Sequence, residues 1–253
     1  LGLLLFVGHS QPAPTQQDYR TTGFRSGEEG LTASERVGRA IWFYAAAGND
    51  RFHTYVFQQR LGVLIDWYRV LNTKSREGRF KTWGLINDPD CCVPGSRNCP
   101  ARSYEETYGF DYCPGDDELL KFVGKTGYRD PACDLEDAPL SPGFPPGHAQ
   151  RQDPCDLKFG TSTGAMGLRK FPNPRFDADK WREFNGSLGT WEKYGQRLKE
   201  GDEYADSRAS RLLDGSIEPP YLIGMACGAC HIAFDPLNPP KDPTHPKWEN
   251  IVG

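Results

Sequence analysis

The eight cysteines of this 253-residue chain form two groups, and they constrain the fold more than any other feature. Cys227 and Cys230 are separated by two small residues near the C-terminal end. The other six lie in segments rich in proline and glycine: Cys91, Cys92, Cys99, Cys113, Cys133 and Cys155. Disulfides staple such segments in exported proteins, so we predict disulfides and an oxidising compartment, periplasmic or secreted. A bond between adjacent cysteines is strained, so Cys91 and Cys92 are each expected to pair elsewhere.

Composition favours one large domain in which helices are joined by irregular loops. The chain has 28 Gly, 21 Pro and a mean hydropathy of -0.65, which indicates many turns, while 12% aromatic residues supply bulky core side chains. The net charge of -4 provides no excess of basic groups for phosphate backbones, so nucleic acid is not an expected partner. We predict a mainly α fold with extensive irregular loops.

Residues 1–14 begin with a short apolar run and continue into a polar stretch that contains proline. The run is too short to span a bilayer, so no membrane span is expected in the mature form. We interpret residues 1–14 as a signal-peptide remnant with a processed N-terminus. A frayed hydrophobic terminus is the alternative.

Four further segments have recognisable patterns. Thr32 and Glu35 form a capping box, which predicts a helix over about residues 33–47. Apolar residues recur at helical spacing between Leu61 and Leu71, which predicts a helix buried nearly all round. Turn signals recur over residues 81–159, which we interpret as a loop-rich, disulfide-stapled surface insertion. An aromatic stripe over residues 181–198 predicts a core-facing helix, and such a stripe could also wall a flat macrocycle.

The motif that carries chemistry is Cys227-Gly-Ala-Cys230-His231, because C-x-x-C-H is the attachment signature of c-type haem. Residues three apart on a helical turn share a face, so both thiols can add to the vinyl groups of one porphyrin. The imidazole of His231 is then the expected proximal iron ligand. We therefore predict one haem c, bound by Cys227, Cys230 and His231.

Two other interpretations of the motif have less support from the sequence. A redox-active C-x-x-C pair would be expected to open a helix after a strand in a βαβ unit, whereas this motif follows a double proline. A zinc site would need a second closely spaced pair of ligands, which the sequence lacks.

The sixth iron ligand decides whether the haem transfers electrons or does chemistry. Met166 is a candidate, and its thioether would give an electron-transfer site, although a lone methionine is more often core packing. Met225 is too close to the proximal side and is expected in the core. The histidines His53, His148 and His245 are expected to be structural or on the surface.

Several segments resemble the N-terminal half of secreted di-haem proteins related to bacterial cytochrome c peroxidases, and most specifically the haem-containing rubber oxygenases. Besides the haem motif, the similar segments are 38–43 with Gly48 and Asn49, 160–164, 171–174, 234–240 and 247–250. The similarity covers most of residues 35–253, and only the haem motif is diagnostic by itself.

The resemblance implies a cytochrome c-like haem domain over residues 15–253, with the insertion at about 81–159. Relatives of this kind carry two c-type haems, and in rubber oxygenases the N-terminal haem binds dioxygen and cleaves polyisoprene. This chain has one haem motif, so we expect it to be a fragment whose second haem and distal pocket lie in a missing C-terminal domain. The catalytic residues are accordingly not identified.

The leading functional hypothesis is a haem-dependent oxidoreductase of the dioxygenase or peroxidase type, with dioxygen or peroxide and an apolar substrate such as polyisoprene as partners. An electron-transfer cytochrome with a redox partner is the alternative. A module whose haem only stabilises the fold is a third class. Calcium is a further candidate, at Asp116-Asp117-Glu118, where a solvated acidic surface is the simpler interpretation.

Overall fold

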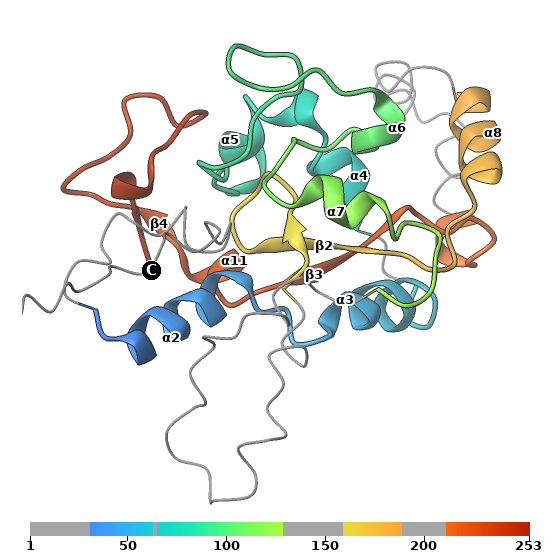
Figure 1. Cartoon of the computed structure of the whole chain (residues 1–253), viewed down its shortest axis with the longest axis horizontal. Coiled ribbons are helices and arrows are strands. Elements are labelled where there is room, and N and C mark those ends of the chain that lie inside the picture. The colour runs from blue at the N-terminus through green and yellow to red at the C-terminus, as the bar shows by residue number, and fades with distance from the viewer. Residues whose placement is uncertain (1–30, 63–64, 129–158, 189–210) are drawn as a thin grey trace, which may run out of the picture.

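The computed structural model describes residues 31–62, 65–128, 159–188 and 211–253, and it consists of short helices around two small sheets (Figure 1). The first half contains the helices α2 (Ala33–Tyr44), α3 (Asn49–Arg51), η1 (Phe52–Gln58), α4 (Trp67–Val70), η2 (Thr73–Ser75), α5 (Arg79–Trp83), α6 (Tyr104–Thr107) and α7 (Asp116–Leu120). The second half contains β1 (Thr161–Ser162), β2 (Leu168–Pro172), α8 (Ala178–Leu188), β3 (Tyr221–Met225), α11 (Gly228–His231), β4 (Ala233–Phe234), η6 (Trp248–Asn250) and β5 (Ile251–Val252).

The centre of the molecule is a three-stranded antiparallel sheet in the order β1-β2-β3. Strands β2 and β3 are paired along their full length, from Leu168 opposite Met225 to Pro172 opposite Tyr221. Every residue of β2 is buried, although two of its five residues are basic. A second, two-stranded sheet joins β4 to β5 near the C-terminal end.

The two basic residues of β2 are buried because each has polar partners. The Arg169 guanidinium donates to the carbonyls of Phe159 at 2.8 Å and Gly160 at 2.9 Å. The Lys170 ammonium lies 2.9 Å from Asp116 of α7 and over the ring of Phe110. Paired in this way, charged side chains can occupy a central strand without the full cost of desolvation.

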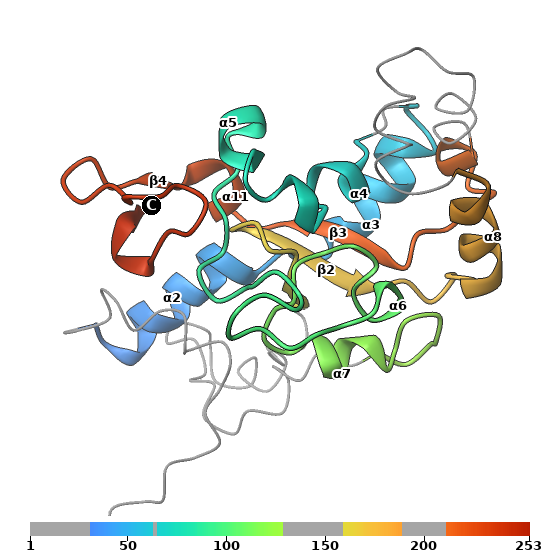
Figure 2. The ribbon, with the colours of Figure 1, turned by 90° about the horizontal axis from the view of Figure 1, so that it is seen from above.

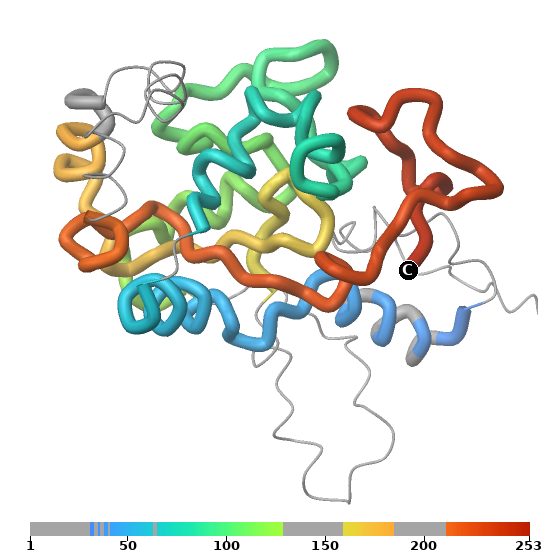
Figure 3. The backbone as a smooth tube through the Cα atoms, turned by 180° about the vertical axis from the view of Figure 1, so that it is seen from behind, coloured from blue at the N-terminus to red at the C-terminus, as the bar shows by residue number. Residues whose placement is uncertain are grey.

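The helices lie on both sides of the sheet. In Figure 1, α2 and α3 run below β3, whereas α4, α5, α6 and α7 lie above the strands. The views from above and from behind show α8 at one end of the molecule and the ribbon of β4 and β5 at the other (Figures 2 and 3). The sheet therefore connects the N-terminal helices to the segment that contains Cys227 and Cys230.

Two clusters of buried apolar side chains form the core. The larger one lies between the sheet and the upper helices and includes Tyr68, Leu71, Phe110, Leu119, Leu168, Trp181, Phe184, Tyr221 and Ile223. The smaller one joins α2 to the C-terminal segment and consists of Phe43, Tyr44, Ile86, Phe159, Met166 and Ile251.

The predicted mainly α, cytochrome c-like fold is wrong for the described residues. Helices make up 34% and strands 12% of them, and the eight named α-helices are short. The centre is an antiparallel sheet and not a bundle of helices. The prediction failed because the strands are only two to five residues long and β2 carries buried charges, so no alternating pattern marks them.

The helices predicted from the sequence are found in the structure to different degrees. Helix α2 is confirmed, with the capping box of Thr32 and Glu35 at its start. The buried helix predicted over 61–71 is wrong, because among the described residues of this segment only Trp67–Val70 is helical, and Leu61 is 62% exposed. In α8 the first part of the aromatic stripe is core-facing, as predicted, and its continuation past residue 188 lies outside the described residues.

The described half of the segment 81–159 is stapled, as predicted, by Cys91–Cys113 and Cys92–Cys99. Cys91 and Cys92 thus pair elsewhere and not with each other. This part is not only a surface excursion, because Phe110 and Leu119 are in the core. The segment 1–14, Cys133, Cys155 and His148 lie outside the described residues.

The two disulfides indicate that this chain matures in an oxidising environment. In the ranges that the structure describes, no helix has both the length and the apolar character needed to cross a bilayer.

Candidate functional site

Cys227, Cys230 and His231 lie together on the short helix α11, and all three side chains are exposed. Both thiols are free, in contrast to the cysteines of the stapled segment. Because Cys227 caps the helix and Cys230 follows one turn later, the structure brings the predicted site residues together at the surface.

Strand β3 leads into α11, and Asn49 of α3 fixes the end of that strand. The Asn49 amide nitrogen donates to the Met225 carbonyl at 2.6 Å, and its oxygen accepts from the Met225 N–H at 2.8 Å. One residue further, the backbone N–H of Ala226 donates to the carbonyl of Gly167 at 2.8 Å. The chain is thus held by polar contacts directly before the motif.

Two glycines allow the backbone of α11 to approach its neighbours closely. Gly167 has a φ of +72°, and a Cβ there would lie 2.1 Å from the backbone nitrogen of Ala229. Gly228, inside the motif, faces α2, and a Cβ there would lie 3.2 Å from the Phe43 ring. Since β-carbon contacts below 3.0 Å do not occur in proteins, Gly167 is required in the turn before β2, where the chain lies against the backbone of α11.

The imidazole of His231 packs against Trp42, which is in the last turn of α2. The two ring centroids are 5.8 Å apart and the planes are inclined by 48°. Within the described part of the chain, neither ring nitrogen of His231 has a hydrogen-bond partner. Both nitrogens are therefore available, one for a metal and the other for a proton acceptor.

The arrangement fits a covalently attached haem. Attachment needs two reduced thiols on one face of a helical turn with an imidazole beside them, and α11 presents these groups exposed and unbonded. Zinc fits poorly, because no group of three or more His, Cys, Asp or Glu side chains among the described residues could hold a metal ion.

The surroundings of the motif differ in one respect from those predicted when a redox-active thiol pair was considered. The motif does open a helix directly after a strand, because β3 ends at Met225 and α11 begins at Gly228. The helix has only four residues, however, and β3 is antiparallel to its neighbour, so the motif is not part of a βαβ unit. A dithiol function remains the rival to haem attachment at this site.

The candidate sixth ligand Met166 is buried in the smaller core cluster, with 2% of its surface exposed. It packs with Phe43 and Ile86 there, whereas His231 is exposed. The structure therefore does not bring Met166 and His231 together on the open side of α11. The partly buried Met225 packs against the larger core cluster, as predicted.

The two described histidines outside the motif have structural partners. His53 packs edge-on against Phe52, and burial lowers the pKa of His53, an effect that nearby Asp50 opposes. His245 is exposed and within 2.8 Å of Asp242, and these contacts hold the pKa of Asp242 at about 2.

The acidic run proposed for calcium is engaged in ion pairs. Asp116 binds the buried Lys170, Asp117 binds Arg102, and Glu118 binds Lys121. Burial raises the pKa of Asp116, and Lys170 opposes this rise. Each carboxylate already has a cation beside it, so this run offers no open calcium site.

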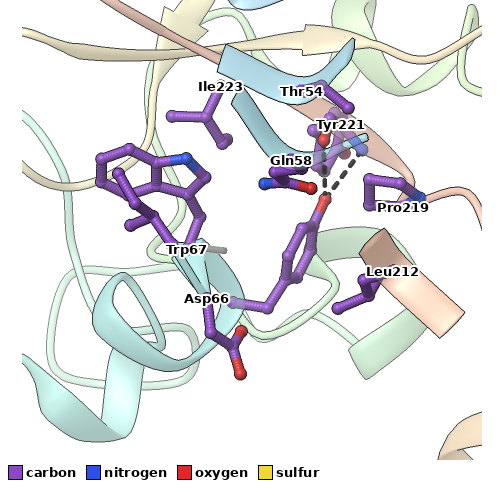
Figure 4. Close-up of a pocket in the computed structure, with 10 residues that line it drawn as sticks. Thr54, Gln58, Asp66, Trp67, Leu212, Pro219, Tyr221 and Ile223 are labelled. Atoms are coloured by element: carbon purple, nitrogen blue, oxygen red, sulfur yellow. Dashed lines mark hydrogen bonds between the residues drawn. The ribbon is translucent and has the colours of Figure 1, made fainter. Parts of the chain in front are cut away.

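A small pocket lies between η1, α4 and β3 (Figure 4). It is lined by Thr54, Gln58, Asp66, Trp67, Leu212, Pro219 and Ile223, among others, and the Tyr68 hydroxyl beside it is bonded to the backbone of Tyr221. Its volume of about 20 Å³ is room for a single water molecule. It is not a substrate site.

Trp42, Asn49 and Gly167 support the motif, and analysis of spacing alone did not identify them. Trp42 and Asn49 come from one stretch of the chain and Gly167 from another, and the only sequence signal was the resemblance of segments that contain Trp42 and Asn49. No protein-family model, no curated protein and no solved structure matches this chain.

Proposed function

We propose that this chain is a c-type haem protein in which Cys227 and Cys230 hold the macrocycle by thioether bonds and His231 ligates the iron. The observation that carries the proposal is that both thiols are free and exposed beside an exposed imidazole on α11. In thioether formation each sulfur bonds to one vinyl carbon and the thiol hydrogen goes to the other. Attachment therefore needs reduced thiols and no oxidant.

For the reaction, we favour an oxidoreductase that activates dioxygen or peroxide. Bound haem would supply either electron transfer or the activation of such a ligand, according to what occupies the position opposite His231. Met166 is buried in the smaller core cluster, which argues against it as a further haem ligand and so against the methionine-ligated electron-transfer site. An electron-transfer cytochrome is the second candidate.

The resemblance to haem-containing rubber oxygenases extends the proposal to oxidative cleavage of a polyisoprene-like substrate. The proposal includes a periplasmic or secreted location, which the two disulfides support. A second haem in a further domain is part of the same proposal.

The test of haem attachment is a mass spectrum of the protein produced with a c-type maturation system. The expected result is the mass of the chain plus one haem, located on a peptide that contains Cys227 and Cys230. The double variant Cys227→Ser/Cys230→Ser should carry none. Free thiols, or a disulfide between them, in fully matured protein would reject the proposal in favour of a dithiol site.

Spectra then test the role of His231. His231→Ala should keep the thioether-bound haem but change its spin state, whereas His245→Ala, at another exposed histidine, should leave the spectrum unchanged.

Turnover assays separate the two reaction classes. Incubation with polyisoprene should give aldehyde and ketone end groups, and peroxide reduction is the alternative activity. A low-spin haem that is unaffected by added cyanide, with neither activity, would favour the electron-transfer cytochrome.

A further inference from the structure

We propose that Trp42 is a positioning residue for the proximal imidazole, holding the ring of His231 at a fixed angle on α11. This inference rests on the proposed haem site. The two residues are far apart in the chain, yet their ring centroids are 5.8 Å apart at an inclination of 48°. This distance lies within the range of packed aromatic pairs.

His231 needs such a contact because no polar group fixes its orientation. In most metal-binding histidines the second ring nitrogen donates to a carboxylate or carbonyl, which sets the orientation of the ring. Neither nitrogen of His231 has a hydrogen-bond partner in the ranges that the structure describes. Packing against Trp42 is the contact that restricts rotation of the ring.

Trp42 can serve this purpose because its own position is fixed from several sides. Phe43, the next residue, is buried in the smaller core cluster and anchors this turn of α2. The Trp42 carbonyl faces Gly228, where a Cβ would lie 3.3 Å from the oxygen. The indole nitrogen lies close to Gly253, where a Cβ would be 3.2 Å from it.

The indole thus bridges α11 and the end of β5. Trp42 is 36% exposed, so part of its side chain is at the surface, as are the side chains of His231 and of both cysteines. A rigid flat group in this place limits the angles at which the imidazole can bind iron, while it takes no part in covalent attachment.

The experiment compares Trp42→Ala, Trp42→Phe and the control Trp83→Ala in haem-loaded protein. Trp83 is also an exposed tryptophan, on α5, and is 49% exposed. All three variants should carry covalent haem by mass spectrometry, since Cys227 and Cys230 are unchanged. The discriminating readouts are the iron–histidine stretching band of the reduced protein and the pH at which half of the imidazole dissociates.

Loss of an orienting partner weakens metal–histidine binding roughly tenfold, so Trp42→Ala should raise the dissociation midpoint by about one pH unit. The stretching band should broaden or shift. Trp42→Phe should recover most of both values, and Trp83→Ala should match the wild type.

Each outcome decides a different question. Haem-loaded Trp42→Ala that is indistinguishable from Trp83→Ala would overturn the positioning role and leave the haem proposal intact. Wild-type protein without covalent haem would instead overturn both. A Trp42→Ala variant that attaches haem and shows the shifted midpoint supports the inference.

Discussion

The side-chain amide of Asn49 forms a pair of hydrogen bonds with the backbone of Met225, 176 residues further along the chain. The pair satisfies both polar groups of the last residue of β3, as another strand would do. It thereby fixes the point from which the chain turns into α11. The geometry of the segment from Cys227 to His231 therefore depends on a residue of the first fifth of the sequence.

Substitution of Asn49 should destabilise the protein and the motif together. Asn49→Ala leaves the Met225 N–H and carbonyl without partners, at an expected cost of roughly 2–4 kcal/mol in the free energy of unfolding. Urea denaturation measures this cost. Asn49→Asp keeps the acceptor but loses the donor, so it should fall between the wild type and Asn49→Ala. Equal stability of all three would contradict the role of the pair.

Gly167 offers a test of the close contact beneath α11. Gly167→Ala must displace the helix, because the new Cβ would lie 2.1 Å from the Ala229 nitrogen. Gly95→Ala is the matched control, since Gly95 has a similar φ of +78° but open space around it. Backbone strain should cost each variant about 1 kcal/mol.

Gly167→Ala should lose more stability than the cost of backbone strain, whereas Gly95→Ala should not. Gly167→Ala should also attach less haem than Gly95→Ala. Thermal unfolding and haem staining compare the pair. Similar results for both glycines would show that the approach of β2 to α11 tolerates a methyl group.

Among the described residues, Asp111 is the only carboxylate that forms ion pairs with two buried arginines. It pairs with Arg76 and, at 3.1 Å, with Arg79, and both Asp111 and Arg79 are fully buried. Asp111→Asn leaves two buried positive charges without their counter-ion, so the free energy of unfolding should fall by about 3–5 kcal/mol. Glu118→Gln, in the exposed pair with Lys121, should change stability by less than about 1 kcal/mol.

Asp90 should make stability depend on pH below neutrality. Burial, with a contribution from Asp88, raises the pKa of Asp90 to about 6, although its oxygen accepts a hydrogen bond from Trp248. The folded protein therefore binds the proton more tightly than the unfolded chain, in which the pKa of Asp90 is near its ordinary value of 3.8. Protonation of Asp90 therefore stabilises the folded protein relative to its ionised form. This stabilisation is complete below the pKa of the unfolded chain and is lost as the pH rises through the pKa of the folded protein.

The Asp90→Asn variant keeps the hydrogen-bond acceptor but does not titrate. The difference in unfolding free energy between wild type and variant should therefore fall as the pH rises from about 4 to about 6, and then stay constant. Urea titrations at a series of pH values measure it. A difference that is independent of pH would show that Asp90 has its ordinary pKa.

The features predicted best from the sequence were those that depend on residues close together in the chain. The start of α2 follows from Thr32 and Glu35, and the disulfides from loop composition. The sheet was missed because its partners are distant and because Arg169 and Lys170 give β2 the composition of a surface loop. Their burial depends on Asp116 and on backbone carbonyls that no local pattern identifies.

In the candidate site, too, the residues that are neighbours in sequence were predicted and the distant ones were not. Cys227, Cys230 and His231 are neighbours in sequence, so spacing alone identified them. The residues that hold them in place, Asn49 and Gly167, act through single close contacts with backbone atoms. Such contacts leave no periodic pattern in a sequence, and only the folded chain reveals them.

The order of the disulfides along the chain has a consequence for biosynthesis. A polypeptide emerges from the ribosome or an export channel with its N-terminus first, so residues up to 113 are present long before Cys227. Both Cys91–Cys113 and Cys92–Cys99 can close in this early part. Cys227 and Cys230 reach the same compartment only after these four cysteines can have paired, so neither disulfide has to wait for the segment that contains α11.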